Sequence, residues 1–233
     1  MSSGPTILSP AELAALQALD TCVVANAIET FDERLRNEGY AANSVHCQFP
    51  QLGTMVGYAA TLRVRGSAPS TTGYLYSENT VWWDYLMSLP APRVVVVQDV
   101  ATRVGLGSFL GEVHMNVLKA LGCIGAVTNG SVRDLPAAQK LGFQLFSGGT
   151  AVSHAYVHIV EFGTPVEIAG LKIKSGDLLH GDLHGFQTIP HDHAAEIPAI
   201  AARIKEKEEP IIELCQSAEF SLDKLRAAIA KKD

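Results

Sequence analysis

Two neighbouring turns of the chain carry three charged side chains whose types suit metal and acid chemistry. Glu112 follows a glycine-rich turn, and Arg133 and Asp134 end the run at 129–134, which follows a short apolar segment. Carboxylates are the ligands that hard divalent cations prefer, and an arginine can clamp a substrate carboxylate through two hydrogen bonds. The spacing therefore indicates a divalent metal beside a small anionic substrate.

The turn before Glu112 supplies a further element for binding an anion. Gly111 directly precedes a predicted helix, whose first backbone N–H groups point out of the helix toward an incoming carboxylate or phosphate. Asp134 is expected to be an inner ligand of the cation, with Glu112 either a direct ligand or a partner of a metal-bound water. A site with so few carboxylates suits Mg²⁺ better than zinc, because Mg²⁺ keeps several of its waters. Such a metal could stabilise the enolate that forms when a C–C bond of a 2-oxo acid breaks.

The same residues also have ordinary structural explanations. Asp134 stands before Leu135-Pro136, a typical helix start, so it could be a helix N-cap and nothing more. Arg133 could be a surface ion-pair partner, and Glu112 a favourable charge at a helix N-terminus. A dinucleotide-binding loop is disfavoured, because the glycines at 105–111 lack the Gly-x-Gly-x-x-Gly spacing.

Composition narrows the class of protein. The 233 residues, of which 47% are hydrophobic and 18% charged, suit a single domain over 1–233 with a sizeable core. The net charge of −6 argues against nucleic acid and anionic membranes as partners. The four scattered cysteines form no Cys-x-x-Cys pair, and no signal or long apolar run is present, so we expect a soluble, cytoplasmic protein.

Hydrophobic periodicity predicts the elements that must position the two turns. We expect an N-terminal helical region over 10–35, a strand at 54–64 and a helix at 79–89. A β-α-β-α-β series follows, with strands at 93–99, 123–128 and 143–146 and helices at 112–121 and 135–141, which predicts parallel pairing. Short strands at 166–168, 171–173, 177–180 and 186–189 read as a meander, and a helical extension over 194–231 ends the chain. The prediction is an α/β fold with a central mixed sheet, flanking helices and C-terminal helices.

An ordered set of motifs resembles a known family. The motifs are MVGYAAT at 55–61, GE at 111–112, GAVTNGSVRD at 125–134, PVEIAG at 165–170 and SGD at 175–177. Together they are similar to the regulator-of-ribonuclease-activity-A-like (RraA-like) family, over about 20–215. That family includes the 4-hydroxy-4-methyl-2-oxoglutarate/4-carboxy-4-hydroxy-2-oxoadipate aldolases. The resemblance implies a swivelling β/β/α-type domain that assembles as a homotrimer or homohexamer, with its active site near the subunit boundary.

The resemblance also implies roles within the aldolase branch. Glu112, Arg133 and Asp134 match its acidic residue and its Arg-Asp pair, and the ribonuclease-inhibiting branch lacks that metal-ligating Asp. Arg133 would support the keto or enolate oxygen of the substrate, and Asp134 would bind Mg²⁺ or Mn²⁺. The pattern often continues with an acidic residue three places after the Asp, and Ala137 departs from it here.

The pyruvate carboxylate would bind at the start of the helix that opens the site. The resemblance assigns it to the turn at Gly111 and to the backbone N–H groups of Val113 and His114, next to Glu112 and Arg133.

Histidines form a second candidate group. His180, Asp182 and His184 alternate and would share one face of a straight strand, and His191 and His193 follow soon after. Imidazoles with a carboxylate suit Zn, Fe or Mn, although we favour a structural or supporting role for this segment. His184 is a hypothetical proton donor to the enolate.

A further histidine pair lies upstream of that segment. His154 and His158 are four residues apart and would share a face if the segment were helical. The pair lacks the glutamate of a His-Glu-x-x-His zinc site, so we do not predict a metal there.

These observations lead to one predicted function and two alternatives. We predict a class II, divalent-metal pyruvate aldolase or oxaloacetate decarboxylase-like lyase that acts on a small 2-oxo acid. It would cleave a 4-hydroxy-2-oxo diacid by retro-aldol reaction, decarboxylate oxaloacetate, or both, through a metal-stabilised pyruvate enolate. The alternatives are a non-catalytic regulator that binds an RNA-processing enzyme and a metal-dependent hydrolase or isomerase that uses 180–193. The far end of the substrate would meet the loop at 67–77, the histidine segment or a neighbouring subunit.

Overall fold

A mixed β-sheet forms the centre of the computed structural model, which describes residues 7–70 and 80–230. The strand order is β1-β6-β5-β3-β2-β10-β11, with β4 added beside β5 and β7 beside β2. Strands β2, β3, β5 and β6 run parallel, whereas β1, β7, β10 and β11 pair antiparallel. Most of the predicted loop at 67–77, and the first residue of the helix predicted at 79–89, lie outside the described residues.

The strands and helices have the following bounds. The strands are β1 (His46–Cys47), β2 (Met55–Arg65), β3 (Arg93–Asp99), β4 (Ser108–Leu110), β5 (Cys123–Val132), β6 (Gln144–Thr150), β7 (His158–Phe162), β8 (Val166–Ile168), β9 (Leu171–Ile173), β10 (Leu178–Asp182) and β11 (Gly185–Ile189). The α-helices are α1 (Pro10–Gln17), α2 (Thr21–Glu29), α3 (Val81–Ser88), α4 (Glu112–Ala120), α5 (Leu135–Leu141), α6 (Ile197–Gln216) and α7 (Leu222–Ile229). Two short 3-10 helices are η1 (Pro50–Leu52) and η2 (His191–His193).

The sheet is buried on both faces, as the four-valine run predicts. Val95 and Val97 of β3 point into a core built with α3, α4 and α5. Val94 and Val96 alternate with them and pack on the opposite face, against the small β8-β9 hairpin. A β-layer, a sheet and a helix layer result, and this confirms the predicted α/β fold of the β/β/α type.

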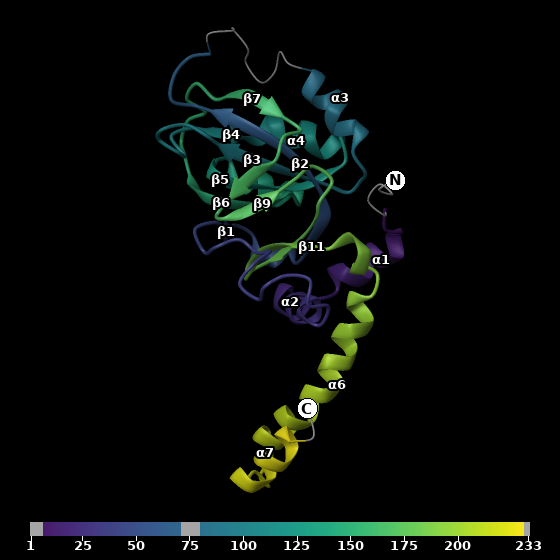
Figure 1. Cartoon of the computed structure of the whole chain (residues 1–233). Coiled ribbons are helices and arrows are strands. Elements are labelled where there is room, and N and C mark those ends of the chain that lie inside the picture. Colours follow the sequence, from purple (N-terminus) through teal and green to yellow (C-terminus); the bar gives the residue numbers. More distant parts are fainter. Residues whose placement is uncertain (1–6, 71–79, 231–233) are drawn as a thin grey trace.

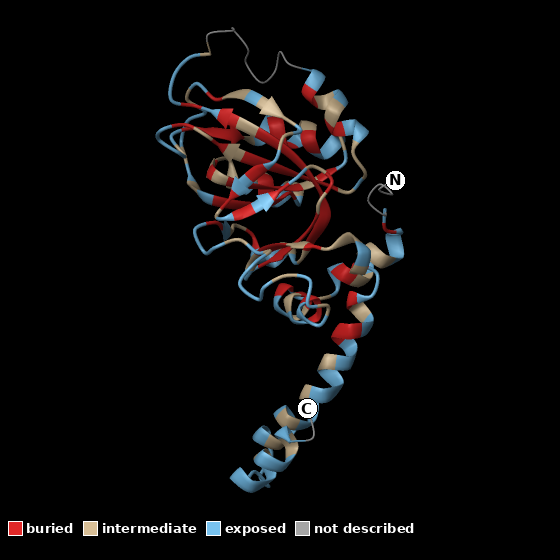
Figure 2. Ribbon diagram, in the orientation of Figure 1, coloured by how far each residue is buried: buried red, intermediate tan, exposed pale blue. Residues whose placement is uncertain are grey.

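A third core cluster joins α1, α2 and the first turns of α6 to the sheet. Leu16 of α1, Val24 of α2 and Ile197 of α6 pack there against Tyr58 and Leu178. Beyond this contact α6 leaves the body as an arm, and α7 folds back beside it (Figure 1). The arm is mostly exposed (Figure 2).

The N-terminal helical region differs from the prediction of one continuous segment over 10–35. It consists of α1 and α2, which meet at an angle of 107°, and α2 ends at Glu29. Asp20 causes the break, because its backbone is extended and its side chain accepts the N–H of Val23 at 2.8 Å as the N-cap of α2.

No single helix in the described ranges combines the length and apolar character needed to cross a bilayer. Helices α1 and α2 meet that test of length and composition together, across their bend.

The segment at 154–158 is also not helical. His154 lies in a loop, and His158 begins β7, which pairs antiparallel with β2. Pairing with a strand about a hundred residues away decides this conformation, and local spacing does not reveal it.

Candidate active site

Strand register brings the two charged turns together. Leu110 of β4 is paired with Val132 of β5, so Gly111 and Arg133 leave the same edge of the sheet side by side. They open on a cavity of about 320 Å³ at the carboxyl ends of parallel strands, where ligands collect in open α/β sheets. The cavity is lined by Ser108, Phe109, Gly111, Glu112, Val113, His114, Arg133, Asp134 and His154.

Asp134 links the two turns through its carboxylate. Its Oδ2 accepts the backbone N–H of Glu112 at 2.8 Å and lies 3.4 Å from Nε of Arg133. The residue has a left-handed backbone (φ 56°, ψ 40°), which Asp tolerates better than most residues. Asp134 does occupy the N-cap position of α5, but its side chain makes no capping bond there. It satisfies an amide of α4 instead, so the N-cap explanation does not account for the side chain.

A close approach explains the glycine at position 111. A Cβ there would lie 2.9 Å from Nε of Arg133 and 3.0 Å from Oδ2 of Asp134. The backbone φ of −129° is ordinary for any residue, so space is the constraint. Gly111 thus lets both charged side chains lie against the start of α4.

The walls of the cavity differ in exposure. The side chains of Arg133 and Asp134 are about one-third exposed (33% and 36%), and Val113 and Glu112 face solvent. His114 is buried, with its ring edge-on against Phe109 and its Nδ1 3.1 Å from the carbonyl of that residue. Burial lowers the pKa of His114 to about 4, so its ring is a neutral part of the wall at physiological pH.

The donor set at this cavity suits a hard cation with few protein ligands. Two carboxylates, from Glu112 and Asp134, line it. In the described residues no three His, Cys, Asp or Glu side chains gather closely enough to hold a metal by themselves. Zinc takes three or four protein ligands, whereas Mg²⁺ and its analogue Mn²⁺ can be held by one or two carboxylates with waters. The residues fit the predicted Mg²⁺ or Mn²⁺ better than zinc.

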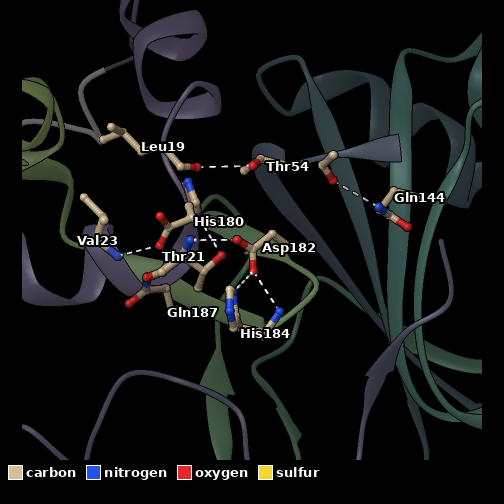
Figure 3. A network of polar contacts seen from close by, with 11 residues as sticks. Leu19, Thr21, Val23, Thr54, Gln144, His180, Asp182, His184 and Gln187 are labelled. Carbon is tan, nitrogen blue, oxygen red and sulfur yellow. Dashed lines mark hydrogen bonds and ion pairs between the residues drawn. The ribbon is translucent and has the colours of Figure 1, made fainter. Parts of the chain in front are cut away.

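The histidine-rich strand has structural contacts (Figure 3). His180 is fully buried, with Nδ1 3.1 Å from Oγ1 of Thr21 and Nε2 3.1 Å from the carbonyl of Leu16. Asp182 accepts the N–H of Thr21 at 2.9 Å and also contacts His184 through its other oxygen. The strand therefore anchors α1 and α2 to the sheet.

His184 lies at the opposite edge of the sheet from the cavity. Gly181 is paired with Met55, the first residue of β2, and His184 lies beyond that pair. The cavity is at the other end, past the last residues of β4 and β5, which run in the direction of β2. Within one chain the structure does not bring His184 to Arg133 and Asp134.

The two remaining histidines of the segment also have partners away from the cavity. His191 lies with Nε2 3.0 Å from the carbonyl of Gly176. His193 lies between Glu33 (3.0 Å) and Glu196 (3.2 Å). The segment therefore does not form a second metal centre in the described structure.

Protonation of His180 should destabilise the fold. Burial lowers the pKa of His180, so the unfolded chain, with a histidine pKa of about 6.5, takes up the proton first as pH falls. The contribution of His180 to the free energy of unfolding should be constant above about pH 6.5 and fall below it until the folded-state pKa is reached. Urea unfolding of the native chain and of His180→Gln, each at about pH 7.5 and 5.5, measures this contribution. The free energy of unfolding should fall less between these pH values in the variant than in the native chain.

His193 provides a control of opposite sign. Its contacts with Glu196 and Glu33 raise its pKa, so it stabilises the fold most at low pH, and His193→Gln should steepen the acid loss. If the free energy of unfolding of His180→Gln falls between the two pH values as much as that of the native chain, the pH dependence belongs to other groups.

Two cavity elements were missed by sequence reasoning. Strand β4 is three residues long and lies between glycines, so the run at 105–111 reads as a loop. His154 reaches the cavity from the loop after β6, and its spacing to His158 gives no sign of that position.

Comparison with known proteins agrees with this architecture. A "Putative 4-hydroxy-4-methyl-2-oxoglutarate aldolase" of Halalkalibacterium halodurans is 33% identical over 104 residues, which cover 43% of this chain and 48% of that protein. The chain thus matches about half the length of this relative.

Solved structures share the fold. An uncharacterized protein from Pseudomonas syringae pv. tomato superposes with a TM-score of 0.73 at 23% identity, covering 97% of this chain and 98% of that one. RraAS2 of Streptomyces coelicolor, described as an unusual member of the RNase ES inhibitor RraA protein family, gives a TM-score of 0.67 at 22% identity, covering 88% and 96%. The family model "RraA-like: Aldolase/RraA" matches residues 21–186, which is well over half of the sequence. The predicted resemblance is confirmed, and the chain belongs to the RraA-like family.

Proposed function

We propose that the chain is a class II, divalent-metal lyase that cleaves a C–C bond of a small 2-oxo acid and yields a pyruvate enolate. One observation carries the proposal: the carboxylate of Asp134 joins Arg133 and the start of α4 at one cavity. A carboxylate that would hold a cation, a fixed positive charge and a helix N-terminus therefore lie where one small acid could contact all three.

Each group has a separate task in substrate binding. The first turn of α4, including the amide of Val113 and that of His114, would hold the pyruvate carboxylate, and Gly111 keeps the approach open. Asp134, with Glu112 as ligand or as partner of a bound water, would hold Mg²⁺ or Mn²⁺. When bound, the cation would supply Lewis-acid stabilisation of the enolate charge.

Arg133 acts on the developing charge. Its guanidinium would donate hydrogen bonds to the keto oxygen as that oxygen becomes an enolate. Loss of CO₂ from oxaloacetate and retro-aldol cleavage of a 4-hydroxy-2-oxo diacid give the same enolate. One site would therefore support both reactions.

The assembly and setting belong to the same proposal. We propose a homotrimer or homohexamer in the cytoplasm, formed from single-domain subunits, with no nucleic acid or membrane partner. The net charge of −6 and the mixed charges of the exposed arm agree with this.

Two other functions have less support. The Streptomyces relative is described within a family of RNase inhibitors, so a non-catalytic role in RNA processing is the second candidate. A hydrolase or isomerase that uses 180–193 is opposed by the burial of His180 and by the hydrogen bonds of Asp182.

Pyruvate release tests the proposal. Purified protein is assayed with oxaloacetate and with a 4-hydroxy-2-oxo diacid, after EDTA treatment and after addition of Mg²⁺ or Mn²⁺. We expect release from both substrates that EDTA abolishes and either metal restores. No release at any metal concentration, together with tight binding to a ribonuclease, would favour the regulator instead.

A further inference from the structure

One histidine lines the candidate cavity without belonging to either charged turn. His154 lies in the loop between β6 and β7 and lines the same cavity as Arg133 and Asp134. Its side chain is exposed, so the cavity can reach it. The cavity thus has an imidazole on a loop separate from the two charged turns.

The loop that carries His154 is fixed to β4. Ser108 donates its backbone N–H to the carbonyl of Ser153 at 3.0 Å, and the hydroxyl of Ser153 accepts the N–H of Ala155 at 2.9 Å. The two segments approach so closely that a Cβ on Gly107 would lie 2.5 Å from the carbonyl oxygen of His154. The same short strand therefore leads to Gly111 and holds the loop of His154.

The backbone beside His154 is strained. Ala155 has a φ of +48°, in the left-handed region that residues with a Cβ rarely adopt. Such strain persists where surrounding contacts over-determine the conformation, and it gathers at functional sites.

A hydrogen bond selects the tautomer of the His154 ring. Nδ1 lies 2.7 Å from the carbonyl oxygen of Ala155. A carbonyl can only accept, so Nδ1 carries the hydrogen, and in the neutral ring Nε2 holds the lone pair. The ring is set up to take up a proton at Nε2.

We infer that His154 is the general base that removes the C4 hydroxyl proton in retro-aldol cleavage, an inference that rests on the proposed function. Nε2 takes the proton, the O–H electron pair forms the new C4=O bond, and the C3–C4 bond breaks. The electron pair of that bond remains on C3 as the pyruvate enolate. Return of the proton from Nε2 to C3 gives pyruvate and neutral His154, so atoms and charge balance.

Decarboxylation of oxaloacetate does not require a general base at the site. Oxaloacetate has no C4 hydroxyl, and its C3–C4 bond breaks with release of CO₂ to give the same enolate. No base is needed for bond breaking, and water can protonate C3. The two reactions therefore separate the role of His154 from binding and enolate stabilisation.

His154→Gln tests the inference by comparing the two activities in one preparation. We expect kcat for retro-aldol cleavage to fall about 100-fold, the lower range for loss of a general base, with decarboxylation changed by less than about threefold. Added imidazole should restore part of the retro-aldol activity in His154→Ala, which a merely structural role would not allow.

His158→Gln is the matched control. His158 has a similar contact, Nδ1 to the carbonyl of Tyr156 at 2.9 Å, but does not line the cavity, so both activities should remain. A parallel fall of both activities in His154→Gln, or an unchanged retro-aldol rate, would overturn the role of His154 while leaving the lyase in place. A native chain inactive on both substrates at every metal concentration would overturn the lyase and the inference together.

Discussion

Asp134→Asn should lower metal-dependent pyruvate release by about 100-fold or more while leaving the fold intact. An asparagine has the shape of the aspartate, and its side-chain oxygen can still accept the N–H of Glu112, which Asp134 accepts at 2.8 Å. The variant loses the negative charge that faces Arg133 and would bind the cation. Steady-state kinetics at saturating Mg²⁺, with thermal unfolding as the check on folding, measure the effect.

Asp177→Asn is the matched control for that experiment. Asp177 also accepts a backbone N–H, from Lys174 at 2.7 Å, but it lies in a turn away from the cavity. The activity of Asp177→Asn should equal that of the native chain. Near-native turnover in Asp134→Asn would remove Asp134 from the metal site.

Gly111→Ala should reduce kcat/KM by about 10- to 100-fold with little change in thermal stability. The added methyl would lie within 3.0 Å of atoms of both Arg133 and Asp134, so these side chains must move away from α4. The backbone φ of −129° suits alanine, and the fold is therefore not strained. Kinetics with oxaloacetate at varied Mg²⁺ should show weaker binding of both metal and substrate.

Gly149→Ala separates this effect from a general cost of replacing glycine. A Cβ at position 149 would meet Oγ of Ser131 at an ordinary 3.6 Å. Activity of this variant should be unchanged, and full activity of Gly111→Ala would mean that the close approach at Gly111 has no catalytic consequence.

Local patterns predicted much of the fold. The bounds of β3, α5, β8 and β9 match those expected, because apolar runs, glycine turns and a Leu-Pro helix start define them within a few residues. That Glu112 would lie near Arg133 and Asp134 was also predicted, from the two neighbouring turns and the family resemblance, although the short strand β4 that leads to Gly111 was not.

Features that depend on distant contacts were not predictable in the same way. The N-cap at Asp20 ends a pattern that otherwise reads as one helix, and β7 forms through its pairing with β2. Distant contacts also decide which histidine lies near the cavity. The strand register places His184 beyond the start of β2, away from the cavity, whereas the contact of its loop with β4 brings His154 to the cavity.

Binding of Mn²⁺ tests most directly whether a cation and a 2-oxo acid meet at Asp134. Electron paramagnetic resonance can follow free Mn²⁺ with and without oxalate, a planar analogue of the pyruvate enolate. The native chain and Asp177→Asn should bind Mn²⁺ more tightly when oxalate is present, and Asp134→Asn should bind it at least about tenfold more weakly. Equal affinity of Asp134→Asn and the native chain for Mn²⁺ and oxalate would contradict the site described above.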